Sequence, residues 1–453
     1  MTLPAIDCSA TLDETAAHLS RMIQIDTTNP PGGELPLAVY LESVLSGEGI
    51  ETHVLRPTTG RGATIARIRG TGRAQPILIT AHLDVVSVQR DAWSVDPFGG
   101  VITGGYVYGR GAIDDKGMLA TELMAMLLLK RHVVDQRVSL ERDVIFAATA
   151  DEETGGLHGL GWIIDHHPEL IRAEYALNEG GRIRVVDGKP LYAAVQTTEK
   201  VPHSVSVRAR GPGGHASIPL PGNAVAHLAR AVACIASHEE PVQLLPTTRE
   251  FFSRLSVVWP EAEVARAMAD IVSDDAERAR RARATLCALP MYNAVLRSGI
   301  SPTVIAGGKQ SNVIPTEAVA YLNIRTLPGD SIDALVGRLR GLVNDPAVEI
   351  TLESRGTDAP ASDHESPMFD AIAKSVSGID EKIVSVPYLS TGATESARLR
   401  AWGVQTFGLL PFPLDADDES RMHGHDERVP LASLEFGARV VFDIVRRMSV
   451  QAF

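Results

Sequence analysis

Cysteine is scarce in this chain, which has three among its 453 residues. Cys8, Cys234 and Cys287 are widely spaced and form no C-x-x-C pair. An odd number of isolated cysteines argues against structural disulfides and fits a reducing compartment. The first residues, 1–7, also lack a basic region followed by an apolar run, so no secretory signal is expected. We therefore predict a cytoplasmic protein.

Excess positive charge and long apolar runs are lacking as well. Lysine and arginine total 43 against 56 aspartates and glutamates, which gives a formal net charge of −13. Because phosphate-rich partners require a basic face, this balance argues against nucleic acid and anionic membranes as partners. The most apolar helical stretch, 118–129, contains Glu122 and is shorter than the roughly 20 residues that span a membrane. It predicts a buried core helix.

Length and changes of pattern predict two domains. A chain of 453 residues exceeds one ordinary domain. Between residues 64 and 199 strands alternate with helices, as in an α/β sheet covered by helices. From residue 200 the expected order β-α-β-β-α-β is typical of a ferredoxin-like fold. The predicted division is a catalytic domain from 1–199 and 357–453, with an inserted satellite domain at 200–356 that contains a helical insert at about 239–299.

Five short motifs rich in acidic and histidine residues follow one another along the chain. In order they are His82-x-Asp84, Asp114-Asp115-Lys116-Gly117, Asp151-Glu152-Glu153, Asn178-Glu179-Gly180-Gly181 and Met422-His423-Gly424-His425. Three of them follow short apolar runs that predict strands, at 77–81, 144–148 and 175–177. Because strand ends carry the ligand-binding residues of α/β sheets, we expect these side chains to converge. Gly180-Gly181 is expected to turn the chain.

These side chains suit two metal ions. Zinc takes imidazole nitrogen and carboxylate oxygen, with about four ligands. Two histidines and three carboxylates suffice for two ions if one carboxylate bridges them at a separation of about 3.5–4 Å. In the first motif, Asp84 can orient the imidazole ring of His82. In Glu152-Glu153 the neighbours must take different parts, one as a metal ligand and the other as a base.

Each motif also has a simpler interpretation when it is taken alone. A histidine two residues before an aspartate is commonly a hydrogen-bonded surface pair, and 151–153 could be a solvated acidic turn. Residues 114–117 could cap the following helix. His423 and His425 could belong to an ordinary loop. The order of the five motifs and their shared position at strand ends favour the metal site.

The ordered set resembles metallopeptidase family twenty, which includes aminoacylases, glutamate carboxypeptidases of the carboxypeptidase G type and succinyl-diaminopimelate desuccinylases. The resemblance runs from His82 through Gly-Pro-Gly-Gly-His215 and Asn312-Val-Ile-Pro to Met422-His423. It implies an α/β catalytic domain of the di-zinc exopeptidase type with an inserted ferredoxin-like α+β satellite, a lid or dimerisation domain. The roles it implies are Asp114 as bridging ligand, Glu153 and His423 on one zinc, His82 and Glu179 on the other, Glu152 as general base, Asp84 as the residue that orients His82, and a cis peptide bond between Asp114 and Asp115.

The resemblance also assigns residues of the satellite. It implies that His215 reaches across a homodimer to stabilise the oxyanion of the tetrahedral intermediate. It further implies that Asn312, Arg325 and Gly392 contact the substrate, since the planar fork of an arginine can pair with both oxygens of a carboxylate. Taken alone, His215 on its glycine turn would be a solvated loop residue and Arg325 an edge-strand charge.

One segment departs from the family pattern. Where many members read Gly-Gly-Thr-Asp-x-Arg, this chain reads Gly392-Ala393-Thr394-Glu395-Ser396-Ala397. The arginine position is therefore Ala397, and Arg398 and Arg400 are the nearest replacements. Recognition of a free α-carboxylate then depends on Arg325.

The sequence predicts a zinc-dependent hydrolase that cleaves an amide bond in dipeptides, peptides with a free C-terminus or N-acyl amino acids. In this interpretation a metal-bridging hydroxide, generated with Glu152 as base, attacks the carbonyl. Cobalt or manganese could replace the two zinc ions. Two further hypotheses are a deacylase of a biosynthetic N-acyl amino acid intermediate and a catalytically silent metal-binding protein. An intact Glu152 beside a complete ligand set argues against the silent protein.

Overall fold

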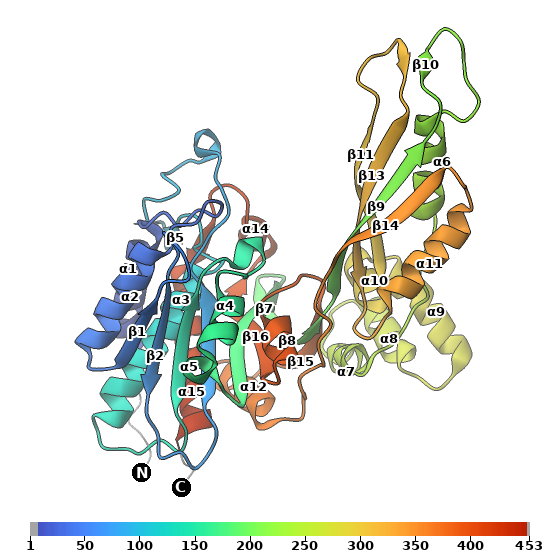
Figure 1. The fold of residues 1–453 in the computed structure, drawn as a ribbon. Helices are drawn as coiled ribbons and strands as arrows, with labels where there is room; N and C mark the ends of the chain where they lie inside the picture. Colours follow the sequence, from blue (N-terminus) through green and yellow to red (C-terminus); the bar gives the residue numbers. More distant parts are fainter. Residues whose placement is uncertain (1–7, 451–453) are drawn as a thin grey trace. The chain divides into compact units, whose positions relative to one another are not determined.

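The structure, a computed structural model, describes residues 8–450 (Figure 1). The chain divides into two compact units, and the second is an insertion in the first. The first unit comprises Met1–Thr197, Ala361–Tyr388 and Thr394–Phe453, and the second comprises Thr198–Pro360 and Leu389–Ala393.

An eight-stranded sheet forms the centre of the first unit. In spatial order its strands are β1 (Glu51–Leu55), β2 (Ala63–Ile68), β6 (Val144–Thr149), β3 (Ile77–His82), β7 (Tyr175–Val186), β16 (Gln405–Leu414), β8 (Lys189–Glu199) and β15 (Val384–Ser390). The central strand β3 is parallel to both β6 and β7, and β7 is parallel to β16. Their carboxyl ends therefore meet at one edge of the sheet, where ligands bind in such folds.

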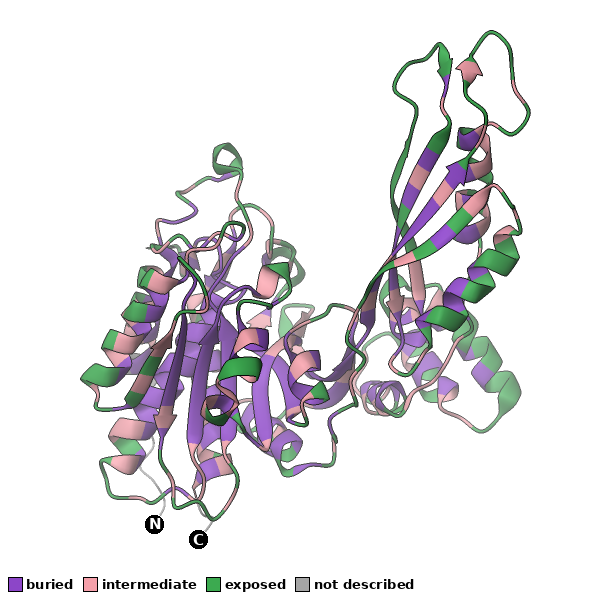
Figure 2. Ribbon diagram, viewed as in Figure 1, coloured by how far each residue is buried: buried purple, intermediate pink, exposed green. Residues whose placement is uncertain are grey.

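Helices cover both faces of this sheet because its strands are apolar on both sides. In β3, Ile77 and Ile79 belong to the core on one face, whereas Leu78 belongs to the core on the other. The strands of this sheet are largely buried (Figure 2). The helices are α1 (Cys8–Ile23), α2 (Leu35–Gly47), α3 (Lys116–Leu129), α12 (Pro367–Ser377) and α15 (Leu431–Ser449) on the first face, and α4 (Leu160–His166), α5 (Pro168–Ile171) and α13 (Ser396–Ala401) on the second.

Every residue of α3 is buried, as the sequence predicts for a core helix. Burial raises the pKa of Glu122 on this helix well above its usual value, which favours the neutral form in the apolar interior. Within residues 8–450, no helix is both long and apolar enough to cross a membrane. The helix continues into one π-helical turn, η2 (Lys130–Val134).

A small three-stranded sheet brings the C-terminal histidine motif to the Asp114 loop. Its strands are β17 (Arg428–Pro430), β5 (Tyr106–Tyr108) and β4 (Val101–Thr103), in that order. Arg428 pairs with Tyr108, and the amide of Gly109 donates to the carbonyl of Glu427 at 2.9 Å. Segments more than 300 residues apart in sequence are thereby joined. The remaining short elements of the first unit are η1 (Arg90–Ala92), η3 (Glu152–Thr154) and α14 (Ala416–Ser420).

The second unit contains a four-stranded antiparallel sheet with the spatial order β11-β13-β9-β14. This is the ferredoxin-like arrangement that the order of elements predicts. Helices α6 and α11 contribute to the core that it shares with the sheet. The elements are β9 (Val201–Arg210), α6 (Ala224–Ala236), β11 (Gly299–Gly307), β13 (Glu317–Thr326), α11 (Ile332–Val343) and β14 (Val348–Arg355).

Two further features belong to the second unit. A short antiparallel pair of strands, β10 (Gly214–His215) with β12 (Val313–Ile314), carries the predicted histidine. The segment between α6 and β11 is helical, as the sequence predicts, and consists of α7 (Pro246–Leu255), α8 (Ala262–Ile271), α9 (Ala276–Cys287) and α10 (Pro290–Leu296).

One local prediction is wrong. Gly180-Gly181 does not turn the chain, because β7 continues through both residues to Val186. The reason is close packing rather than a turn. A Cβ atom on Gly181 would lie 2.1 Å from the carbonyl oxygen of Ala194 on β8 and 2.2 Å from that of Gly408 on β16. Only glycine permits this approach of three backbones.

The glycine of the second motif has a similar packing role, which leads to a prediction. A Cβ atom on Gly117 would lie 2.2 Å from the carbonyl oxygen of Ala112, whereas one on Gly47 of α2 would meet nothing within 4 Å. We expect Gly117→Ala to lower the free energy of unfolding by about 1–3 kcal/mol through overpacking. Gly47→Ala should leave it unchanged or raise it by up to about 1 kcal/mol. Denaturant unfolding of both variants measures this, and equal stabilities would contradict the close approach.

Candidate active site

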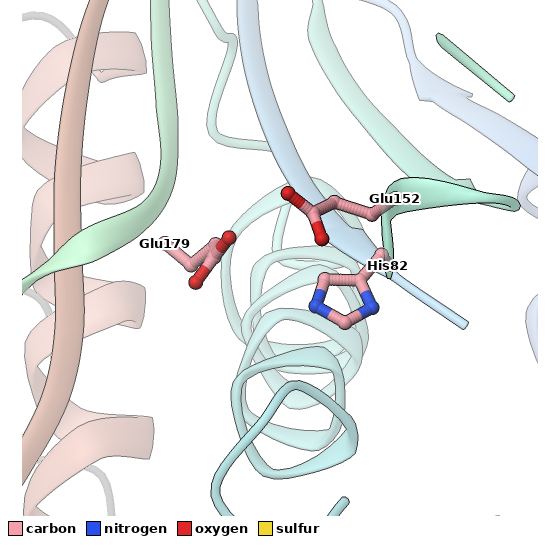
Figure 3. Close-up of side chains that lie close together, drawn as sticks. All are labelled: His82, Glu152 and Glu179. Atoms are coloured by element: carbon pink, nitrogen blue, oxygen red, sulfur yellow. The ribbon is translucent and has the colours of Figure 1, made fainter. Parts of the chain in front are cut away.

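The site lies where β3, β6 and β7 present their polar residues at one edge of the first unit's sheet. His82 is the last residue of β3 and is opposite Thr149, the last residue of β6. Glu152 follows β6 by three residues, and Glu179 lies within β7. Figure 3 shows the carboxylates of Glu152 and Glu179 converging on the imidazole of His82.

Two overlapping groups of side chains could each hold a metal ion. The first is His82, Glu152 and Glu179, and the second is His82, Asp114 and Glu153. Within each group the ligand atoms lie within 4.8 Å of one another. Imidazole nitrogen and carboxylate oxygen are the donors that zinc and related divalent ions accept, so the residues fit the expected metals.

Asp114 lies between two histidines that are more than 300 residues apart in sequence. Its Oδ1 is 2.9 Å from Nε2 of His82, and its Oδ2 is 3.2 Å from Nε2 of His423. Nε2 of His423 is also 3.3 Å from Oε1 of Glu153. The peptide bond from Asp114 to Asp115 is cis, as the resemblance implies. Asp114 thus contacts both histidines, each through a different carboxylate oxygen.

Asp84 holds the turn that carries the two glutamates. Its Oδ1 accepts from the backbone amide of Glu152 and its Oδ2 from that of Glu153, both at 3.1 Å. The ring Nδ1 of His82 is 2.9 Å from the backbone carbonyl oxygen of Asp84 and 3.6 Å from its carboxylate. The backbone carbonyl therefore makes the close contact with the imidazole, while the carboxylate serves mainly the glutamate turn.

The electrostatics of the site reflect its crowding with carboxylates. Burial, followed by the negative charge of Asp114, raises the pKa of Glu179 to about 8. Burial and then the charge of Glu179 raise the pKa of Glu152 well above its usual value. Hydrogen bonds to Asp114 and Glu153 raise the pKa of His423 to about 10. The raised pKa values of the two glutamates show that it is unfavourable to ionise all these neighbouring carboxyls together, and a bound cation would offset that cost.

Two buried residues that support the site had no predicted role. Glu427 accepts hydrogen bonds from the backbone amides of Ile113 at 2.8 Å and Asp114 at 3.0 Å, and pairs with Arg110 at 2.5 Å. Arg110 also donates to the carbonyl of Gly424 at 2.8 Å. The pair joins the Asp114 loop to the His423 loop. The position of Glu427, four residues after His423, gives a sequence signal, but its partner Arg110 is 317 positions away.

The predicted residues of the second unit fall into two groups at opposite ends of its sheet. His215 pairs with Val313 in the β10–β12 pair, and the carbonyl of Asn312 accepts from the amide of Ala216 at 3.0 Å. This group lies near the Glu317 end of β13, whereas Arg325 lies at the other end (Figure 1). Eight residue steps along an antiparallel strand correspond to about 27 Å.

Arg325 and Gly392 lie at the same end of this unit. The amide of Lys200 donates to the carbonyl of Ser390, two residues before Gly392, at 2.9 Å. Burial, and then the nearby charge of Arg325, lower the pKa of Lys200 to about 8. The Nε of Arg325 donates to Asn323 at 3.0 Å, while its buried Nη1 has no hydrogen-bond partner among the described residues. A buried donor without a partner is available to an anionic ligand.

The segment that departs from the family pattern supports the loop after β6. Glu395 is buried and accepts from the hydroxyl of Thr149 at 2.7 Å and from the amide of Leu160 at 3.2 Å. Ala397 is also buried. Arg398 donates to the carbonyl of Gly155 at 3.1 Å, and Arg400 to that of Thr406 at 3.3 Å. Both candidate replacements for the missing arginine are therefore engaged within the first unit.

Known proteins resemble this chain in sequence and in fold. It is 29% identical over 380 residues to a probable carboxypeptidase S-like 2 of Dictyostelium discoideum, covering 79% of this chain and 68% of that protein. It is 24% identical to the human N-fatty-acyl-amino acid synthase/hydrolase PM20D1, covering 82% and 74%. An M20 family metallo-carboxypeptidase from Sulfolobus solfataricus has the same fold, with a TM-score of 0.70 at 18% identity over 96% of this chain and 99% of that one.

The fold class and the family predicted from the sequence are confirmed by these similarities. The sequence pattern of Peptidase family M20/M25/M40 matches residues 78–447, which is most of the chain. The match includes every residue that the ordered motifs contribute to the site. The chain is a hydrolase that belongs to peptidase family M20/M25/M40.

Proposed function

We propose that this protein uses two metal ions, zinc in the first instance, to hydrolyse the amide bond of peptides or N-acyl amino acids. The observation that carries this proposal is the geometry of Asp114, whose two oxygens lie 2.9 and 3.2 Å from the ring nitrogens of two histidines. The proposed ligands are Asp114 as the bridge, Glu153 and His423 for one ion, and His82 and Glu179 for the other. Cobalt or manganese are alternative metals with the same donors.

The residues of the site have different parts in the proposed amide hydrolysis. When bound, the two ions would polarise the substrate carbonyl and lower the pKa of the attacking water. Glu152 takes a proton from that water and delivers it to the leaving amine nitrogen. Asp84 holds Glu152 and Glu153 through their backbone amides, so that the two carboxylates keep separate positions.

The substrate class follows from what the named relatives share. A carboxypeptidase and an N-fatty-acyl-amino acid hydrolase both act on an amide bond next to an amino acid with a free carboxylate. Arg325, with its buried and unpartnered Nη1, is the proposed partner of that carboxylate, and Gly392 lines the same region. A dipeptide, a peptide with a free C-terminus and an N-acyl amino acid all satisfy this requirement.

The two other hypotheses have less support. A deacylase of a biosynthetic intermediate would use the same site, and a panel of N-acyl amino acids against dipeptides under identical metal loading separates the two. A silent metal-binding protein would have no physical need for a half-buried Glu152 held beside the ligands. We also propose a cytoplasmic location, since Cys234 and Cys287 are both free.

A homodimer through the satellite domain is part of the proposal. One chain's Arg325 and its His215–Asn312 group lie about 27 Å apart along β13. A small substrate cannot contact both groups of one chain, which supports placing the two groups in the sites of two different copies. The resemblance assigns His215 and Asn312 to the partner's site. There His215 would donate to the oxyanion of the transition state, an interaction worth about 2.7–4 kcal/mol.

The exposed edge of the second unit supports association of two copies. Strand β11 lies at the edge of its sheet and carries exposed Val304 and Ile305. Tyr321 on the neighbouring strand β13 is opposite Val304 and is also exposed. An edge strand with apolar side chains is a template for pairing with another chain unless it is covered.

The two-metal proposal makes a prediction about Asp114. Elemental analysis of the purified protein should give about two ions per chain, and Asp114→Ala should lose both, because this carboxylate would serve two ions at once. Asp135→Ala is the matched control, since the exposed Asp135 pairs with Lys130 and belongs to neither group of metal-binding side chains. One tightly held ion that survives Asp114→Ala would contradict the two-metal site.

The separate roles of the adjacent glutamates make a second prediction. Glu152→Gln should lower kcat by at least about 100-fold while metal content and thermal stability stay near the wild-type values. Glu153→Gln should instead reduce metal occupancy. The control is Glu169→Gln, at an exposed carboxylate of α5. If Glu152→Gln lost metal, Glu152 would be a ligand together with His82 and Glu179; if it kept its activity, another residue would be the base.

The dimer proposal predicts recovery of activity in a mixed dimer. His215→Ala and Glu152→Gln chains should each be inactive alone, yet a dimer of one of each would contain one site with both residues intact. Up to about half of the sites in such a dimer would work, by the symmetry of a two-fold interface. The chains are co-expressed with two tags and the mixed species is purified and assayed. No gain over either parent would show that His215 does not act across the interface.

A further inference from the structure

Behind the glutamate turn lies a buried asparagine with four polar contacts. Asn29 is 3% exposed and follows α1 by six residues. Its Nδ2 lies 2.8 Å from Oδ2 of Asp84, 3.1 Å from the hydroxyl oxygen of Thr154 and 3.3 Å from Oδ1 of Asp151. Its Oδ1 accepts from Arg61 at 2.9 Å. One amide therefore contacts the carboxylate that holds Glu152 and Glu153 as well as the turn on which they lie.

Arg61 determines which way this amide faces. A guanidinium carries only donors, so the side-chain atom of Asn29 beside it must be the oxygen, and the NH2 group must face Asp84. Arg61 is 8% exposed and is itself held by Glu34 at 2.5 Å and Asp151 at 3.1 Å. Because these ion pairs are buried, each partner has little freedom to rotate. Arg61 and its two carboxylate partners thus fix the orientation of the Asn29 side chain.

The Asp84 carboxylate must keep one orientation to accept its two hydrogen bonds from the glutamate turn. Each of its oxygens accepts from the amide of a different glutamate, so a rotation of the carboxylate would weaken both contacts. The turn also begins with Asp151 at a φ of +69°, a left-handed conformation that costs free energy for a residue with a side chain. Hydrogen bonds from Thr154, His158 and Asn29 to the Asp151 carboxylate hold it there.

We propose that Asn29, oriented by Arg61, is a positioning residue that fixes the Asp84 carboxylate and the Asp151 turn, and thereby the separate positions of Glu152 and Glu153. This inference rests on the proposed function, which assigns Glu152 as base and Glu153 as metal ligand. Asn29 belongs to neither group of metal-binding side chains. Its effect passes through Asp84 and Asp151, which distinguishes it from the residues that the motifs name.

Two substitutions separate this role from general stabilisation. Asn29→Asp keeps the size of the side chain and its contact with Arg61, but replaces the donor that faces Asp84 with an acceptor 2.8 Å from it. Arg61→Lys keeps the charge but loses the fork that contacts Glu34, Asn29 and Asp151 together. Arg67→Lys is the control. Arg67, which lies in β2, is also largely buried, but it pairs with Asp143, away from the site.

The full-length metal-loaded variants are compared with wild type for kcat, KM, zinc affinity and thermal unfolding. We expect Asn29→Asp and Arg61→Lys to lower kcat or zinc affinity by about 10–100-fold, as changes behind metal ligands do, with KM changed less than about threefold. Arg67→Lys should leave kcat, KM and zinc affinity unchanged. Asn29→Ala, which removes the contact without repulsion, should fall between wild type and Asn29→Asp.

The outcomes that overturn this inference are distinct from failure of the proposed function. If wild type binds two ions and is active, but the Asn29 variants keep its kcat and zinc affinity, the positioning role is refuted. Losses that only match the unfolded fraction of each variant refute it equally, because they show a structural role alone. A wild-type protein that binds no metal or hydrolyses no amide substrate would instead refute the proposed function.

Discussion

The mutual repulsion of carboxylates is the constraint on which this structure depends. Asp114, Glu152, Glu153 and Glu179 meet at one edge of a sheet, and burial with neighbouring charge raises the pKa of Glu179 to about 8. Such a cluster is unfavourable unless cations or hydrogen-bond donors offset it. Two histidines supply part of this compensation, and the divalent metals proposed here would supply the rest. Metal binding is therefore coupled to the stability of the site as well as to its chemistry.

A second set of acidic side chains keeps the first set apart. Glu427 and Asp84 do not belong to either group of metal-binding side chains, and each accepts hydrogen bonds from two or more backbone amides of the loops that carry the ligands. Glu395 does the same for the amide of Leu160 beyond the glutamate turn. A carboxylate can satisfy several amides at once because each oxygen has two lone pairs. These hydrogen bonds connect the loops to strands and to one another.

Local sequence features predict where the strands end. They do not predict the hydrogen bonds and ion pairs between residues distant in sequence that support the site. His82 ends β3 as its apolar run indicates, and the ferredoxin-like order of the second unit follows from alternation and helical spacing. The prediction that Gly180-Gly181 turns the chain is wrong, because the sequence alone does not distinguish a glycine pair that permits close packing of strands from one that forms a turn. The pairing of Arg110 with Glu427 and of Asn29 with Asp84 joins residues 317 and 55 positions apart. Spacing within a motif carries no information about such partners.

The second unit shows why residue roles cannot be transferred from motifs without distances. His215, Asn312 and Arg325 all lie in segments that resemble substrate-binding regions, yet about 27 Å of strand β13 separates the first two from the third. A single small substrate between them is excluded by length alone. The proposed homodimer would place the two groups in different sites, since a two-fold axis presents the same surface of each copy to the other. In that proposal the exposed edge strand β11 would provide a surface on which two copies could pair.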